Sequence, residues 1–108
     1  MHLSSSDGFR VELEPDRERV TVRVVGEIDL ATAGDVETPL LELLDRGFDT
    51  VVLDLREVSF LDSSGIHVLV STDRYAASRG AHLSILVGTS RGREVLELCG
   101  AIDHLDVS

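Results

Sequence analysis

Hydrophobic and polar residues alternate near the start of the chain with the period of two that is typical of a strand with one solvent-exposed face. Residues 9–13 follow this pattern, and residues 20–24 repeat it after a turn at residues 15–18. We expect these two segments to pair as an antiparallel hairpin. Residues 1–8 are polar and rich in serine, and we expect them to be disordered.

After the hairpin, helical periodicity alternates with short apolar runs. Thr38 is placed to cap a helix that has Pro39 at its first position and ends at Gly47. Residues 50–55 form a nearly continuous apolar run, which is typical of a central strand covered on both faces. A second helix is predicted to begin near Asp62 and to continue to about residue 78. The stripe that we expect on one face of this second helix comprises Ile66, Leu69, Val70, Asp73 and Ala77.

A third strand–helix pair is expected in the last part of the chain. Residues 81–87 have the pattern of a strand, and Ser90 is placed to cap a helix that ends at Gly100. The apolar face expected for this helix comprises Val95, Leu98 and Cys99. The chain is therefore predicted to be an α/β protein with a mixed β-sheet, in which an N-terminal antiparallel hairpin is followed by β-α units and the helices pack against the sheet.

Charge and composition narrow the class of function. The 108 residues suit one domain, and twenty acidic residues against ten basic ones give a formal net charge of -10. Such a surface repels phosphate backbones and anionic lipids, so neither nucleic acid nor a membrane is expected as a partner. No secretory signal or spanning segment is visible, and Cys99 is the single cysteine and is expected to be a small buried residue. We expect a cytoplasmic protein that holds no cofactor.

The segment from residue 51 to residue 70 has the form of a site. A buried strand leads through a short loop to Asp62, Ser63, Ser64 and Gly65 at the start of a helix. Backbone N–H groups are unpaired at a helix N-terminus, where the helix dipole favours an anion such as a phosphoryl group. The simpler interpretation is that these residues only cap the helix, which is worth about 1 kcal/mol.

Three segments together favour a functional site over a simple helix cap. They are VVGEIDLATA at 24–33, VVLDLREVSFLDSSG at 51–65 and REVLELCGAIDHL at 93–105. The chain resembles the STAS family over residues 9–108, and within it the single-domain anti-sigma-factor antagonists of bacterial partner switches. The resemblance implies the STAS fold and makes Ser63 the phosphoacceptor. It implies that Ser64 is the acceptor's neighbour and that Gly65 lets a partner approach closely.

Three further residues surround the expected phosphorylation site. Asp62 either caps the helix or positions the acceptor hydroxyl. Asp29 matches an acidic family position near the phosphosite, and it also suits a simple cap for the segment starting at Leu30. His67 stands where many family members have glycine, on the same helix face as Ser63. His67 is either an exposed helical residue or a contact for the partner or the phosphoryl group.

The resemblance implies a regulatory phosphoprotein of transcription, in stress response or sporulation, without enzymatic activity. Unphosphorylated, the chain would bind an anti-sigma factor that is also a serine kinase, and so release a sigma factor. Phosphorylation at Ser63 would abolish that binding, and a serine phosphatase of the metal-dependent type would reverse it. The alternative within the family is a STAS interaction module of another partner switch or stress-signalling assembly.

Other classes fit less well. Asp54 at a strand end suits a receiver-like domain, but the chain has no lysine and lacks the acidic pair such domains need. Ser63 lies in L-D-S-S-G, which is not the G-x-S-x-G of serine hydrolases. The histidines and Cys99 do not have the spacing of metal ligands. Residues 88–93 lack the Walker lysine of a phosphate-binding loop.

Overall fold

The computed structural model describes residues 2–6, 8–17 and 19–108. Within these residues, six strands form one sheet in the order β1-β2-β3-β4-β5-β6. The strands are β1 (His2–Ser6), β2 (Phe9–Asp16), β3 (Arg19–Ile28), β4 (Thr50–Leu61), β5 (His82–Leu86) and β6 (Asp106–Val107). The helices are α1 (Ala33–Asp45), α2 (Ser63–Ser78) and α3 (Arg91–Leu98), followed by the short 3-10 helix η1 (Ala101–Asp103).

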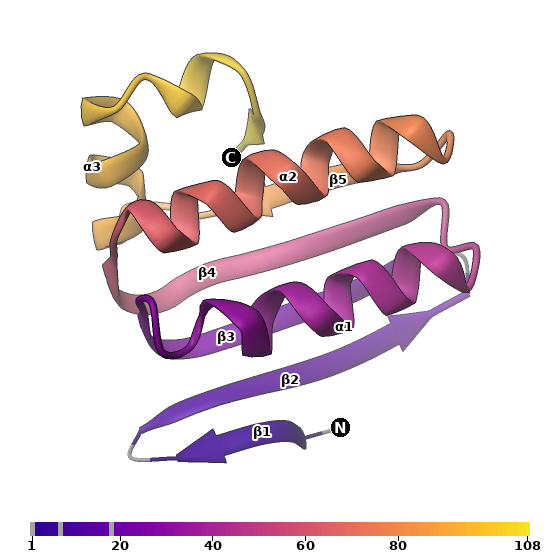
Figure 1. The fold of residues 1–108 in the computed structure, drawn as a ribbon, viewed down its shortest axis with the longest axis horizontal. Coiled ribbons are helices and arrows are strands. Elements are labelled where there is room, and N and C mark those ends of the chain that lie inside the picture. Colours follow the sequence, from indigo (N-terminus) through magenta and orange to yellow (C-terminus); the bar gives the residue numbers. More distant parts are fainter. Residues whose placement is uncertain (1, 7, 18) are drawn as a thin grey trace.

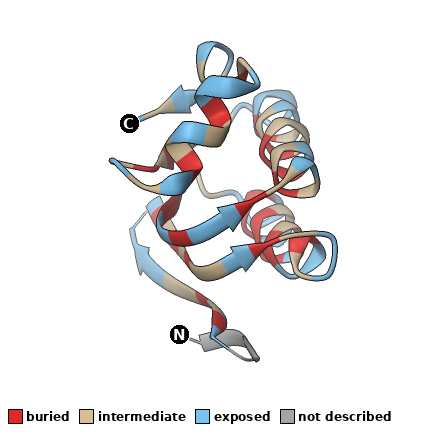
Figure 2. Ribbon diagram, turned by 90° about the vertical axis from the view of Figure 1, so that its left-hand side faces the viewer, coloured by how far each residue is buried: buried red, intermediate tan, exposed pale blue. Residues whose placement is uncertain are grey.

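The sheet is mixed, as the sequence predicted. Strands β1, β2 and β3 pair antiparallel, whereas β3, β4, β5 and β6 pair parallel. Helices α1 and α2 lie side by side over one face of the sheet (Figure 1). Figure 2 shows the same two layers from the side, with buried residues concentrated between them. The predicted α/β fold with an N-terminal antiparallel hairpin is confirmed.

Aliphatic side chains fill the space between the sheet and the helices. Every second residue of the three central strands is buried on this face. These residues are Val20, Val22, Val24, Val51, Leu53, Leu55, Leu83 and Ile85. The helices contribute Val36, Leu40 and Leu44 from α1, and Val68 and Leu69 from α2.

The opposite face of β4 differs from the expected apolar covering. Asp54 lies there with only 2% of its surface exposed, and its carboxylate accepts hydrogen bonds from two arginines. Arg56 donates through Nε at 3.0 Å and Nη2 at 2.9 Å, and Arg23 donates through Nε at 3.3 Å. Asp54 is therefore covered on this face, as the prediction of a strand covered on both faces requires, but arginine side chains cover it instead of apolar ones.

The pKa of Asp54 reflects two opposing effects. Burial raises the pKa, but the hydrogen bonds from Arg56 and Arg23 outweigh it and hold the pKa below its ordinary value. The folded state therefore binds this proton less readily than the unfolded chain. Stability from Asp54 is present above about pH 4 and is lost as the pH falls through the folded-state pKa.

The two ends of the chain contain strands that the pattern did not reveal. Residues 1–8 were expected to be disordered, but residues 2–6 form the edge strand β1, which pairs with β2. Backbone hydrogen bonds hold an edge strand, so it needs no alternation of apolar side chains. At the other end, β6 pairs with β5, and the Ser108 N–H donates to the Ile85 carbonyl at 2.8 Å.

Helix α1 begins earlier than expected. It starts after Thr32 instead of Thr38, and Pro39 lies inside it. Ala33 and Val36 are buried together with Leu40, which extends the apolar stripe by about two turns towards the N-terminus. The packing of this stripe outweighs the hydrogen bond that a proline removes from a helix interior.

We predict that Asp54→Asn lowers the free energy of unfolding by about 1–3 kcal/mol at neutral pH, because two arginines lose a charged acceptor. Denaturation in urea at about pH 7 and about pH 3 should show a smaller difference from wild type at the lower pH. Asp49→Asn, at an exposed carboxylate just before the same strand, is the matched control. A difference that grows on acidification would contradict this role of Asp54.

Candidate functional site

The candidate site lies where the parallel strands β3 and β4 end. Ile28 and Leu61 are paired across the two strands, and the Asp62 N–H donates to the Ile28 carbonyl at 3.2 Å. The loops that follow the two strands therefore start side by side. This pairing brings the segment of Asp29 next to that of Asp62, as the resemblance implied.

Asp62 caps α2. Its Oδ1 accepts hydrogen bonds from the backbone N–H groups of Ser64 at 2.8 Å and Gly65 at 3.4 Å. The carboxylate satisfies two donors that the first helical turn leaves unpaired. Ser63 follows as the first residue of α2 and is exposed, while Ser64 is half-buried. Of the two roles considered for Asp62, capping is the one that the geometry displays.

Gly65 is required by the interior of the molecule. A Cβ at this position would lie 2.2 Å from Leu61 Cδ1 and 3.0 Å from Ile28 Cγ2, and both of those residues are buried. Gly65 is itself buried. The glycine therefore lets α2 pack closely against the strand ends, whereas the sequence had suggested a close approach by a partner.

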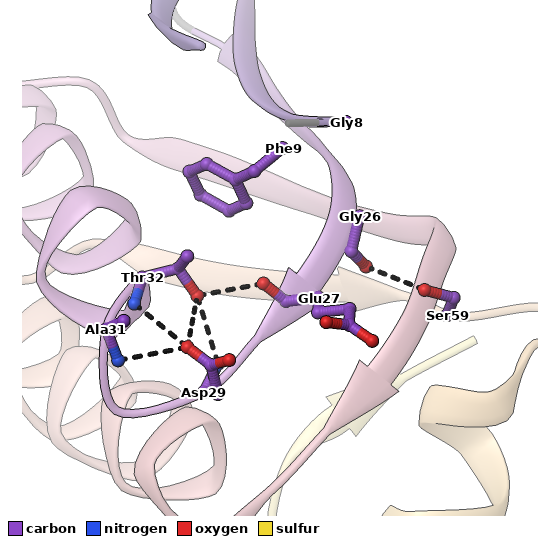
Figure 3. A pocket seen from close by; sticks show the side chains of 8 residues that line it. All are labelled: Gly8, Phe9, Gly26, Glu27, Asp29, Ala31, Thr32 and Ser59. Atoms are coloured by element: carbon purple, nitrogen blue, oxygen red, sulfur yellow. Dashed lines mark hydrogen bonds between the residues drawn. The ribbon is translucent and has the colours of Figure 1, made fainter. Parts of the chain in front are cut away.

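Asp29 organises the turn between β3 and α1. Its Oδ1 accepts from the N–H groups of Ala31 at 2.9 Å and Thr32 at 3.2 Å, and the Thr32 hydroxyl donates to the Glu27 carbonyl at 2.8 Å (Figure 3). This is the capping role that the sequence left open. The carboxylate is half-buried and fixed by these bonds.

A pocket of about 610 Å³ opens beside this turn (Figure 3). Its walls are Gly8, Phe9, Gly26, Glu27, Asp29, Ala31, Thr32 and Ser59. Gly26 has a φ of +110°, and a Cβ there would lie 2.8 Å from the Gly8 carbonyl oxygen. The close backbone approach thus depends on glycine. The ionisable groups of the wall, Glu27 and Asp29, are both acidic, so the pocket is unsuited to phosphate.

A second pocket, of about 460 Å³, lies between α2 and α3. Ser63 and His67 both line it, so the structure brings the predicted acceptor and the histidine one turn further on to the same cavity. The remaining walls are Asp62, Ile66, Val70, Val95 and Cys99. Cys99 is exposed, so its prediction as a buried residue was wrong. The short third helix uses Leu96 for the core in its place.

The sequence did contain an indication of this second pocket, in the apolar stripes that it predicted for α2 and α3. Val95 and Cys99 are four residues apart, as are Ile66 and Val70, so each pair lies on one helix face. Towards the sheet, α2 instead buries Gly65, Val68, Leu69, Thr72 and Ala76. Of the predicted α2 stripe, only Leu69 belongs to that buried set, and Ala77 is exposed.

Three large apolar side chains are exposed next to pocket-lining residues in the sequence. Within the described part of the chain, the exposed large hydrophobic residues are Leu30 (84%), Phe60 (46%) and Leu98 (89%). Leu30 follows Asp29, and Phe60 precedes the Leu61–Asp62 turn. Leu98 adjoins Cys99 of the second pocket. Large apolar side chains exposed on a charged protein are candidates for contact with a protein partner.

No group of three or more His, Cys, Asp or Glu residues is arranged to hold a metal ion within residues 2–6, 8–17 and 19–108. None of the described helices combines the length and apolarity required to span a membrane.

The fold and the strand–loop–helix site define a two-layer α/β domain that presents a serine at a helix start. The model of the STAS domain matches residues 10–108, and the chain belongs to the STAS domain family. The receiver-like interpretation is therefore wrong, and Asp54, which suggested it, is held by arginines.

Named relatives share this fold over most of the chain. The anti-sigma-B factor antagonist of Bacillus subtilis is 28% identical over 100 residues, which are 93% of this chain and 91% of the relative. An anti-sigma factor antagonist from Mycobacterium paratuberculosis has a TM-score of 0.82 at 25% identity, and the match covers 97% of this chain and 89% of the other. The unphosphorylated form of SpoIIAA has a TM-score of 0.75 at 22% identity, with coverage of 91% and 87%, and shows the same fold.

We predict that Asp62→Ala lowers the free energy of unfolding by about 1 kcal/mol, because α2 loses its capping acceptor. Urea denaturation measures the loss, and hydrogen exchange at the Ser64 and Gly65 amides locates it. Asp62→Asn keeps an acceptor oxygen and should retain most of the stability. Equal losses in the two variants would show that the charge, and not the cap, is what matters.

Proposed function

We propose that the chain is an anti-sigma factor antagonist controlled by phosphorylation of Ser63. Unphosphorylated, it binds an anti-sigma factor that is also a serine kinase, and the sigma factor is released. The observation that carries the proposal is the exposed Ser63 side chain at the start of α2, which lines a pocket together with the apolar side chains of Ile66 and Val70. The names of the relatives, which are antagonists of anti-sigma factors, support the same role.

The charge of a phosphoryl group accounts for the switch. Phosphorylation adds about -1.5 to -2 charges at neutral pH. Two N–H groups of the helix start, those of Ser64 and Gly65, are already bonded to the Asp62 carboxylate. The phosphoryl group therefore competes with a neighbouring anion for these donors. It projects to the outer surface, where a docked partner has to cover it.

A penalty of this kind is large enough to break the complex. If desolvation and repulsion together cost about 3–4 kcal/mol, binding weakens by roughly 150- to 1,000-fold. No change of fold is needed for this effect. The chain supplies only the acceptor hydroxyl, and the kinase supplies ATP, magnesium and the catalytic base. A serine phosphatase of the metal-dependent type restores the binding form.

We predict that Ser63→Ala abolishes phosphorylation by the cognate kinase. Intact-mass analysis after incubation with purified anti-sigma kinases of the host and ATP should show one added phosphate on wild type and none on the variant. Ser64→Ala, one residue further along α2, is the matched control and should still gain one phosphate. Absence of phosphate on wild type with every such kinase would leave a constitutive STAS binding module and remove the switch.

We predict that His67→Gly weakens kinase binding by about threefold to tenfold, because His67 lines the same cavity as Ser63 and loses a contact at its edge. Titration calorimetry with the unphosphorylated proteins measures the effect. Ala77→Gly introduces the same helix-weakening residue at an exposed position of α2 and should leave binding unchanged. Equal affinities of the two variants would make His67 an ordinary surface residue.

A further inference from the structure

Helix α3 carries apolar residues on two sides, and the fold fully buries only one of them. Leu96 is fully buried and Gly92 is buried, so this side faces the core. Val95, Leu98 and Cys99 lie on another side, at spacings of three and four residues. Leu98 is 89% exposed and Cys99 is exposed. A helix on a globular protein normally presents polar residues away from its core face, whereas here Leu98 and Cys99 are exposed and Val95 packs only partly against the core.

This partly exposed side of α3 forms one wall of the second pocket. Val95 and Cys99 oppose Ile66 and Val70 of α2 across a space of about 460 Å³. At about 30 Å³ for each water molecule, this space would hold roughly fifteen waters. We call it the α2–α3 groove. Its only acidic side chain, that of Asp62, is engaged in capping, and no arginine lines it.

The groove continues along α2 away from Ser63. A neighbouring pocket of about 340 Å³ shares Val70 with it and is lined further by Asp73, Arg74, Ala101, His104 and Leu105. The two pockets together follow α2 from Ser63 to Arg74. At about 1.5 Å per residue, the eleven steps between these positions correspond to roughly 16 Å. A docking element of the partner therefore meets a mainly apolar pocket beside the phosphorylation site, and then a second pocket whose walls include Asp73, Arg74 and His104.

We propose that the α2–α3 groove receives an apolar side chain of the anti-sigma factor kinase. The groove is continuous with the surface around Ser63, on which the proposed function depends, and this inference rests on that proposed function. A second copy of the chain is a poor occupant, because two molecules of formal charge -10 repel each other. The apolar side chain must therefore come from a different protein, and basic residues around it would complement the acidic chain.

This occupant connects docking directly to phosphorylation. Ser63 lines the groove, so the partner's side chain displaces water beside the acceptor hydroxyl. A phosphoryl group on Ser63 would stand at the mouth of the same groove, where it keeps its hydration only if the groove stays open. Filling the groove and hydrating the phosphoryl group are then mutually exclusive.

Cys99 provides the test, because it is the single cysteine of the chain and it lines the groove. Dithiodipyridine attaches an uncharged thiopyridyl group to the thiolate through a mixed disulfide and releases one thiopyridone. The purified adduct is titrated with the kinase that phosphorylates Ser63 in the intact-mass assay. We expect binding at least tenfold weaker, and full recovery after dithiothreitol removes the group. Circular dichroism before and after reaction checks that the fold is retained.

Val70→Glu is the second variant, since Val70 lines the groove and lies outside the buried core. We expect it to weaken kinase binding by about tenfold or more. Ala77→Glu adds the same charge at an exposed position of α2 outside both pockets and should bind as wild type does. Wild-type affinity in either the thiopyridyl adduct or Val70→Glu overturns the groove proposal and leaves the proposed function standing. Failure of wild type to bind any anti-sigma kinase overturns both.

Discussion

The parallel pairing of β3 with β4 up to their last residues is the constraint on which the site depends. The pair of Ile28 with Leu61 and the bond from the Asp62 N–H to the Ile28 carbonyl fix the two loops against each other. Gly65 then lets α2 descend onto these same two side chains. The position of Ser63 is therefore set by rigid elements on both sides. A loop at the end of a strand can hold a functional group in place in this way.

Both loops at this edge use an aspartate in the same way. Asp29 and Asp62 each accept two backbone N–H groups at the start of the segment that follows a strand. Local bonding of this kind competes well with extended structure and turns the chain sharply into a helix. The acidic residues near Ser63 thus have a structural role first. Their charge is nevertheless part of the surface that a phosphoryl group would join.

Much of this arrangement could be predicted because its causes are local. The alternation in β2 and β3 and the cap of α2 are each encoded within a few residues, and Ser63 is indeed the first residue of α2. The faces of α2 and α3 could not be assigned, because periodicity reveals an apolar stripe without showing what it packs against. In α3 the large side chain that is fully buried is Leu96, whereas Val95 packs only partly against the core and Leu98 and Cys99 are exposed. Strand β1 was missed because its pairing is made by the backbone.

The ion pairs within the chain, on the sheet and on the helices, bear on the rate at which a partner associates. Among the described residues, Arg10, Arg23, Arg56, Arg79 and Arg93 each lie within ion-pair distance of a carboxylate of the chain itself. Half of the ten arginines are therefore locally neutralised, and the long-range field is that of an acidic body. A basic protein is attracted by this field from beyond contact, so its association rate should fall with ionic strength. Dissociation depends instead on short-range apolar contacts, so salt and phosphorylation would act on different steps of the same encounter.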